Sequence, residues 1–140
     1  MSAATGTQLG RTLAGERVAD AMTSGVVSCA PETCLRTVAR IMVDRRVNAV
    51  FVFETAERWG IVTDLDVAAA AVDYVGARTA GESAVAPLVT VHGDDDLEHA
   101  AALMAENAVS HLAVVDSVTG RPVGVISTLD VARAVAAEAS

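Results

Sequence analysis

The sequence predicts a mixed α/β (α+β) fold made of two tandem β-α-β-β-α repeats that pack together with pseudo-two-fold symmetry. The first observation is a duplicated amphipathic stripe, with apolar residues at positions i, i+3, i+4 and i+7 of a helix. The second is a duplicated segment, since residues 60–68 (GIVTDLDVA) align with residues 124–132 (GVISTLDVA). The third is size, because a repeat of about 60 residues has a marginal core by itself. The stripes are Leu35, Val38, Ala39 and Met42, and Leu97, Ala100, Ala101 and Met104.

The first repeat opens with a short β-branched run, which Pro31 ends. The amphipathic stripe then predicts a helix, and two runs rich in β-branched and aromatic residues predict a strand pair. A second helix is expected directly after that pair. The elements are a strand over 26–29, a helix over 32–45, strands over 48–53 and 59–62, and a helix from Thr63 to about Tyr74.

The second repeat has the same order, and two extra residues fall in its loop 116–122, where insertions cost little. Short helical pieces at 15–22 and 79–84 precede the repeats, and we expect each to pack on the other repeat. We divide the chain into a mobile tail (1–15), repeat 1 (16–76) and repeat 2 (77–140). The predicted elements of repeat 2 are strand 88–91, helix 96–107, strands 111–115 and 122–126, and helix 128–138.

Composition argues against several classes of partner. The chain has 10 Lys+Arg against 18 Asp+Glu, a net charge of −8, and it contains no lysine. Scattered arginines on an acidic chain do not suit nucleic acid or an anionic membrane surface. The longest apolar run, residues 67–72, is far shorter than the roughly 20 residues of a membrane span. The N-terminus does not have the pattern of a secretory signal, so a cytoplasmic location is expected. The lysine-free, alanine-rich composition favours a bacterial origin.

Signals for catalysis, metal or redox chemistry are weak. Cys29 and Cys34 have no further Cys or His at metal-ligand spacing. The three histidines are not spaced as ligands on one helix face, and the sequence has no P-loop motif. No nucleophile or acid–base set stands out. We therefore expect no enzyme activity, no metal and no required cofactor.

The duplicated hairpin ending Gly-h-h-Thr/Ser-x-x-Asp, where h is an apolar residue, resembles the signature of the CBS (cystathionine β-synthase) domain pair, or Bateman module. Residues 106–116 (ENAVSHLAVVD) resemble the family's central strand, and residues 123–130 (VGVISTLD) its signature. The resemblance covers about residues 16–138. It rests on order, spacing and duplication together, since no single motif is specific.

The resemblance implies a regulatory module that binds AMP, ADP, ATP or S-adenosylmethionine in clefts between the two repeats. Carried over to this chain, Asp66 and Asp130 would hold the ribose hydroxyls. Thr63 and Ser127 would lie near the ribose or phosphate. The first strand of each repeat would line the base pocket. The further ligand-binding positions are Ser28, Ala30, Thr90, His92 and His111.

The chemistry of these groups suits such a ligand. A carboxylate accepts two hydrogen bonds from a cis-diol, and a helix N-terminus offers free N–H groups to a phosphate. Cations would have to come from arginine or histidine. The nearest candidates by position are Arg45, Arg46, His111, Arg121 and Arg133.

A purely structural interpretation explains the same spacing. Thr-x-x-Asp is also the spacing of a capping box, in which the two side chains satisfy backbone groups of a helix start without any ligand. The two roles are compatible. The repeats also differ from the family pattern, since Phe51 and Ala113 occupy the place of its usual proline. Arg45-Arg46 in repeat 1 corresponds to Asn107-Ala108 in repeat 2, so the two sites are expected to differ.

Two functions therefore remain open. The first is a ligand sensor that passes its signal to another protein. The second is a dimerisation or interaction protein of the same fold, with degenerate and empty nucleotide pockets. In both cases we expect a homodimer, because the second helices carry small alanines that allow close contact. The sequence does not separate head-to-head from head-to-tail pairing.

Overall fold

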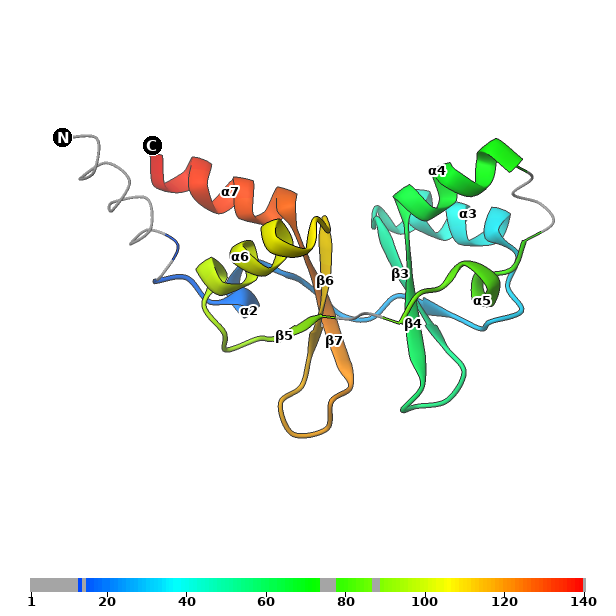
Figure 1. The fold of residues 1–140 in the computed structure, drawn as a ribbon, viewed down its shortest axis with the longest axis horizontal. Helices are drawn as coiled ribbons and strands as arrows, with labels where there is room; N and C mark the ends of the chain where they lie inside the picture. Colours follow the sequence, from blue (N-terminus) through cyan, green and yellow to red (C-terminus); the bar gives the residue numbers. More distant parts are fainter. Residues whose placement is uncertain (1–12, 14, 74–77, 87–88, 140) are drawn as a thin grey trace. The chain divides into compact units, whose positions relative to one another are not determined.

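The computed structural model describes residues 13, 15–73, 78–86 and 89–139, and these form two compact units (Figure 1). Unit 1 combines the described residues up to Gly25 with those from Val89 onward. Unit 2 begins at Val26 and ends before Val89. The tail expected at 1–15 lies outside the described residues except for residues 13 and 15, as does Tyr74 at the end of an expected helix.

Unit 2 is a three-stranded sheet, and three helices contribute buried residues to its core. The sheet order is β2-β3-β4, with β2 parallel to β3 and β3 antiparallel to β4. Buried Leu35, Val38 and Met42 from the helix stripe pack against Val50, Val52 and Val62 of the sheet. Its elements are β2 (Ser28–Cys29), α3 (Leu35–Arg45), β3 (Ala49–Phe53), β4 (Trp59–Thr63), α4 (Asp64–Asp73) and α5 (Ala80–Ser83).

Unit 1 repeats this plan with one more strand. The sheet order is β1-β7-β6-β5, with β5 parallel to β6 and the other neighbours antiparallel. Leu97, Ala100 and Met104 of the second stripe pack against Leu112, Val114 and Ile126. Its elements are α2 (Val18–Ala21), β1 (Thr23–Ser24), β5 (Thr90–His92), α6 (Leu97–Asn107), β6 (His111–Val115), β7 (Pro122–Ser127) and α7 (Thr128–Ala139).

The predicted order of elements is confirmed, with differences at the boundaries. The first long helix begins at Leu35 rather than at residue 32, because residues 31–33 form a turn that starts at Pro31 and Cys34 is extended. The strand predicted over 88–91 is β5 at Thr90–His92, and residue 88 lies outside the described part. The sequence analysis missed β1, since two residues are too few to show an alternating pattern.

The short segment that precedes each repeat packs in the unit of the other repeat, as expected. Val18 of α2 is fully buried in the core of unit 1, and Ala80 of α5 is fully buried in the core of unit 2. Each segment also pairs with the last strand of that unit. Thr23 is the partner of Val125, and Val85 bridges to Ile61. Residues from both repeats are therefore needed to build either unit.

Glycine at the start of each signature permits this pairing. A Cβ placed on Gly124 would lie 2.5 Å from the carbonyl oxygen of Thr23 and 3.2 Å from the sulfur of Met22. A Cβ on the equivalent Gly60 would lie 3.2 Å from the carbonyl oxygen of Val85. Real Cβ atoms do not approach a backbone oxygen as closely as 2.5 Å, so position 124 excludes a side chain unless β1 moves.

We predict that Gly124→Ala destabilises the protein by about 1–3 kcal/mol, because overpacking forces the paired backbone apart. Gly60→Ala should cost less, since its nearest contacts are longer. Gly15→Ala is the matched control, because nothing lies within 4 Å of its added Cβ, and it should change stability by no more than about 0.5 kcal/mol. Urea unfolding of the three variants measures this. Equal stability of Gly124→Ala and the parent would contradict the close pairing.

Candidate functional site

Each repeat ends its hairpin in a hydroxyl residue that also begins a helix. Thr63 closes β4 before α4, and Ser127 closes β7 before α7. The backbone N–H of Thr63 donates to Asp66 Oδ2 at 2.8 Å, and its hydroxyl lies 3.1 Å from the same oxygen. The N–H of Asp66 in turn donates to Thr63 Oγ1 at 3.4 Å. This is the reciprocal capping box that the spacing predicted.

Repeat 2 has the same arrangement, buried more deeply. The N–H and hydroxyl of Ser127 donate to Asp130 Oδ2 at 2.9 and 3.0 Å. The N–H of Asp130 in turn donates to Ser127 Oγ at 3.3 Å. Ser127 is 8% exposed and Asp130 is 7% exposed, the two buried polar residues among those described. Each cap uses one carboxylate oxygen and leaves the other for a further partner.

The second oxygen distinguishes the two repeats. Asp130 Oδ1 accepts a hydrogen bond from Arg133 at 3.2 Å, although that arginine side chain is 68% exposed. The position equivalent to Arg133 in repeat 1 is Ala69. Within the described part of the chain, the corresponding oxygen of Asp66 accepts no hydrogen bond and makes no ion pair.

The surrounding residues extend this difference in charge. Repeat 1 has Asp64 next to Thr63, while repeat 2 has Thr128 at that position. Repeat 1 has Ala49 opposite Thr63 on the neighbouring strand, while repeat 2 has His111 opposite Ser127. The site of repeat 1 thus carries two carboxylates, whereas the site of repeat 2 carries one carboxylate, one arginine and one histidine.

Several of the predicted site residues share one face of each sheet. Val50, Val62, Leu112 and Ile126 face the helix-covered cores, so their neighbours along the strands face the opposite side, which we call the second face. On the second face of unit 2, Ser28 pairs with Phe51, two residues along β3 from the partner of Thr63. On that of unit 1, Thr90 pairs with Ala113, two residues along β6 from His111.

Ala30 and His92 lie further from the capping boxes. His92 pairs with Val115, four residues along β6 from His111, which corresponds to about 13 Å of strand. Its N–H donates to Asp95 Oδ2 at 2.8 Å, and its ring Nδ1 lies 3.3 Å from the carbonyl oxygen of Val115. Ala30 is exposed and follows β2. His111 Nδ1 lies 2.9 Å from the hydroxyl of Ser110.

Among the arginines considered as cations for a phosphate, Arg133 is the one that contacts a capping carboxylate. Arg45 and Arg46 are exposed at the C-terminal end of α3, and Arg46 ends that helix in a left-handed conformation (φ 55°). Arg121 is exposed in the β6–β7 loop. Sequence analysis named Arg133 but missed its pairing with Asp130. The i, i+3 spacing of the two residues on one helix was the available signal.

Phe51, at the position of the family's usual proline, is 1% exposed on the second face of unit 2. Its ring packs against Trp59 (centroids 5.6 Å apart) and against Phe53 (6.3 Å). The equivalent Ala113 in unit 1 is also buried, but it brings no ring to the corresponding face. The two second faces therefore differ in bulk as well as in charge.

The part of the chain that the structure describes has neither a metal-binding cluster nor a helix that could span a membrane. No group of three or more His, Cys, Asp or Glu side chains is placed to hold a metal ion. Both cysteines are unbridged, and burial raises the pKa of the Cys29 thiol, with Thr33 opposing the shift. No described helix is both long and apolar enough to cross a bilayer.

Comparison with known proteins finds the same family in both repeats. The family model described as "CBS domain" matches residues 18–73 and 83–137. The CBS domain pair of protein MJ0100, solved with 5′-methylthioadenosine and S-adenosyl-L-methionine, superposes with a TM-score of 0.78 at 22% identity, covering 88% of this chain and 98% of that one. A search of curated proteins found no match.

Two further solved structures are similar. The CBS domain protein PAE2072 from Pyrobaculum aerophilum, complexed with AMP, is 26% identical with a TM-score of 0.74, covering 88% of this chain and 97% of that one. Hypoxic Response Protein I, with two coordinated zinc ions, is 25% identical with a TM-score of 0.66, covering 84% and 98% respectively.

We predict that Asp130→Ala lowers the free energy of unfolding by about 1–2 kcal/mol without any ligand, because the N–H and hydroxyl of buried Ser127 lose their acceptor in the capping box. Arg133→Ala should cost less than about 1 kcal/mol, since the guanidinium is mostly exposed and its ion pair is screened. Urea unfolding of both variants measures the difference. If Arg133→Ala cost as much as Asp130→Ala, the ion pair rather than the cap would be what stabilises this helix start.

Proposed function

The chain belongs to the CBS domain family, and from that membership we propose that it is a regulatory module that senses an adenosine ligand, not an enzyme. One observation carries the proposal. In each repeat, a capping box places an acidic side chain at a strand-to-helix junction with one carboxylate oxygen outside the cap. Similar proteins have been solved with AMP and with S-adenosyl-L-methionine. AMP, ADP, ATP and S-adenosylmethionine are the candidate ligands, and no cofactor is required.

Asp66 and Asp130 are proposed to bind the ribose of the ligand. A cis-diol offers two O–H donors, and a carboxylate whose cap occupies one oxygen still accepts from the other. Ser28 lies on the second face of unit 2, and Thr90 lies on the second face of unit 1. The strands that carry these two residues are proposed to line the base pocket. The sites as a whole, including Ala30, His92 and His111, remain predictions.

The two sites are proposed to prefer different ligands because their charges differ. In repeat 2, the exposed Arg133 side chain can turn from Asp130 toward a phosphate, and the N-terminus of α7 adds free N–H groups. In repeat 1, Asp64 and Asp66 would repel a phosphate. A neutral or cationic adenosine compound such as S-adenosylmethionine suits repeat 1 better.

The signal is proposed to leave the molecule through association with another protein. We propose a homodimer that contacts a separate protein effector. The alternative is an interaction protein of the same fold with empty pockets. One observation favours that alternative: both oxygens of Asp130 already have partners within the chain, so its site is satisfied without a ligand.

We predict that one or more of AMP, ADP, ATP, S-adenosylmethionine and NAD raises the melting temperature. A ligand at 100 times its dissociation constant adds about 2.7 kcal/mol of stability, or roughly 5–10 °C for a chain of this size. Asp66→Ala should remove the shift for a ligand of repeat 1, and Asp130→Ala for a ligand of repeat 2. Differential scanning fluorimetry of purified protein measures this.

Glu82→Ala is the matched control, because Thr79 and Glu82 form a third capping box with the same geometry at the start of α5. This variant loses a cap but should keep the full ligand shift. If Glu82→Ala abolished the shift equally, general destabilisation would explain the loss. If none of the five compounds moved the melting temperature, the interaction protein with empty pockets would be the better account.

A further inference from the structure

The two capping carboxylates differ in how many further hydrogen bonds they can accept. A carboxylate oxygen has two lone pairs, so the whole group offers about four acceptor positions. In both repeats Oδ2 already accepts from an N–H and from a hydroxyl of the cap. Among the described residues, Oδ1 of Asp66 accepts no hydrogen bond, whereas Oδ1 of Asp130 accepts one from Arg133 at 3.2 Å. The site of repeat 2 therefore has fewer open acceptor positions than the site of repeat 1.

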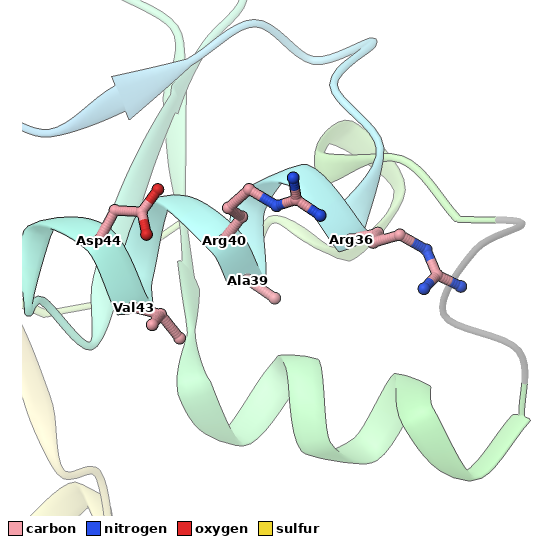
Figure 2. A pocket seen from close by; sticks show the side chains of 5 residues that line it. All are labelled: Arg36, Ala39, Arg40, Val43 and Asp44. Atoms are coloured by element: carbon pink, nitrogen blue, oxygen red, sulfur yellow. The ribbon is translucent and has the colours of Figure 1, made fainter.

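Burial explains why Arg133 contacts Asp130. The aspartate is 7% exposed, and a buried carboxylate is unfavourable unless other groups pair with it. Arg40 and Asp44 on α3 are a contrasting case, because both are exposed and Figure 2 shows their side chains on the same side of the helix. They make no ion pair within the described part of the chain, although they are four residues apart. These two residues line a shallow groove together with Arg36, Ala39 and Val43.

The contact of Arg133 also competes with any ligand that donates to Asp130. The arginine side chain is 68% exposed, so its guanidinium can leave the carboxylate at little cost in free energy. Once it has left, Asp130 Oδ1 can accept two hydrogen bonds, and the guanidinium is open to an anion. The equivalent position of repeat 1, Ala69, has no such group. The other basic side chain near this cap is His111, on the strand opposite Ser127.

We propose that Arg133 is a latch on the site of repeat 2, one that pairs with Asp130 when the site is empty and makes the site select adenosine compounds that carry a phosphate. A ligand with both a cis-diol and a phosphate replaces both partners of the pair, since the diol donates to Asp130 and the phosphate accepts from Arg133. A nucleoside without a phosphate displaces the guanidinium without offering it an anion. This inference rests on the proposed adenosine ligand and adds how repeat 2 selects it.

Removal of the latch is tested in an Asp66→Ala background, which lacks the ribose carboxylate proposed for repeat 1. Arg133→Ala should strengthen adenosine binding about two- to fivefold, because Asp130 Oδ1 no longer has a competing partner. The ratio of the adenosine to the AMP dissociation constant should fall about tenfold or more, because only AMP loses a charge-assisted contact. Arg133→Lys should keep part of the preference for AMP, since it retains the charge without the planar guanidinium. Isothermal titration calorimetry measures both constants.

Arg58→Ala is the matched control for net charge. Arg58 is likewise an exposed arginine paired with a carboxylate, since its guanidinium lies 3.9 Å from Glu54. Its removal should change neither dissociation constant by more than about twofold. Salt concentration gives a second readout, because salt screens the exposed pair of Arg133 and Asp130. Adenosine should bind the Asp66→Ala protein more tightly as salt is raised, and this dependence should disappear when Arg133→Ala is added.

Transfer of the latch to repeat 1 tests the same idea with an added side chain. In an Asp130→Ala background, Ala69→Arg places an arginine three residues after Asp66, at an exposed position of α4. Adenosine binding should weaken about two- to fivefold, because the new guanidinium competes for Asp66 Oδ1. Ala68→Arg is the matched control, since it is also exposed and adds the same charge. Residues two apart on a helix do not face each other, so Ala68→Arg should leave adenosine binding unchanged.

Two results would overturn the latch and leave the ligand sensor intact. One is an unchanged ratio of the two dissociation constants in Arg133→Ala, and the other is adenosine binding that Ala69→Arg weakens no more than Ala68→Arg does. If neither AMP nor adenosine bound the Asp66→Ala protein or its Arg133→Ala variant, the latch and the ligand site of repeat 2 would both be wrong. Asp66→Asn is a second background that preserves folding, because its amide oxygen can still accept from the N–H of Thr63 in the cap.

Discussion

Both units depend on the close approach of a segment from the other repeat to the last strand of the hairpin. In unit 1 that segment is β1, whose Thr23 carbonyl lies where a side chain on residue 124 would have to be. In unit 2 it is the stretch around Ala84 and Val85, which approaches Gly60. Because each segment precedes the other repeat in sequence, neither unit contains only its own repeat. The strand that receives the segment also leads, three residues later, to the capping box.

The capping box links stability to the candidate ligand site. A helix that begins directly after a strand must find partners outside its own hydrogen-bond ladder for its first N–H groups. The N–H groups of Asp64 and Thr128 donate to backbone carbonyls of the neighbouring strand end, and those of Asp66 and Asp130 donate to the hydroxyls of the capping boxes. In return, one oxygen of each carboxylate accepts from the N–H of the hydroxyl residue. The box of Thr79 and Glu82 shows that the same geometry occurs at the start of a short helix without a matching strand end. A cap is therefore no proof of a site, and the placement of the carboxylate at the strand end is what matters.

The two repeats share their core and backbone features but differ in their surface residues. The apolar stripes, the glycines and the capping boxes recur at equivalent positions. The left-handed residues that end α3 and α6, Arg46 and Ala108, also correspond. In contrast, the residues around the boxes and on the outer helices differ in charge between the repeats. Arg133 in repeat 2 is equivalent to Ala69 in repeat 1, and Arg36 in repeat 1 is equivalent to Glu98 in repeat 2. Such differences leave the cores unaffected, and they allow two similar units to recognise different partners.

The order of elements, the duplication and the capping boxes could all be predicted from the sequence. The elements and the boxes depend on local spacing: the helix stripe repeats within about two turns, and Thr63 and Asp66 are three residues apart. The duplication is visible because the same residue pattern occurs twice. The sequence also predicted that the segments before each repeat pack in the other unit. Three features required the folded chain: which backbone approaches Gly124, the contact of Arg133 with the second oxygen of Asp130, and the pairing of His92 four residues along β6 from the partner of Ser127. The glycine contact and the strand register depend on residues distant in sequence. The Arg133 pairing depends on which of its rotamers the folded surface leaves accessible, and sequence spacing alone fixes none of these.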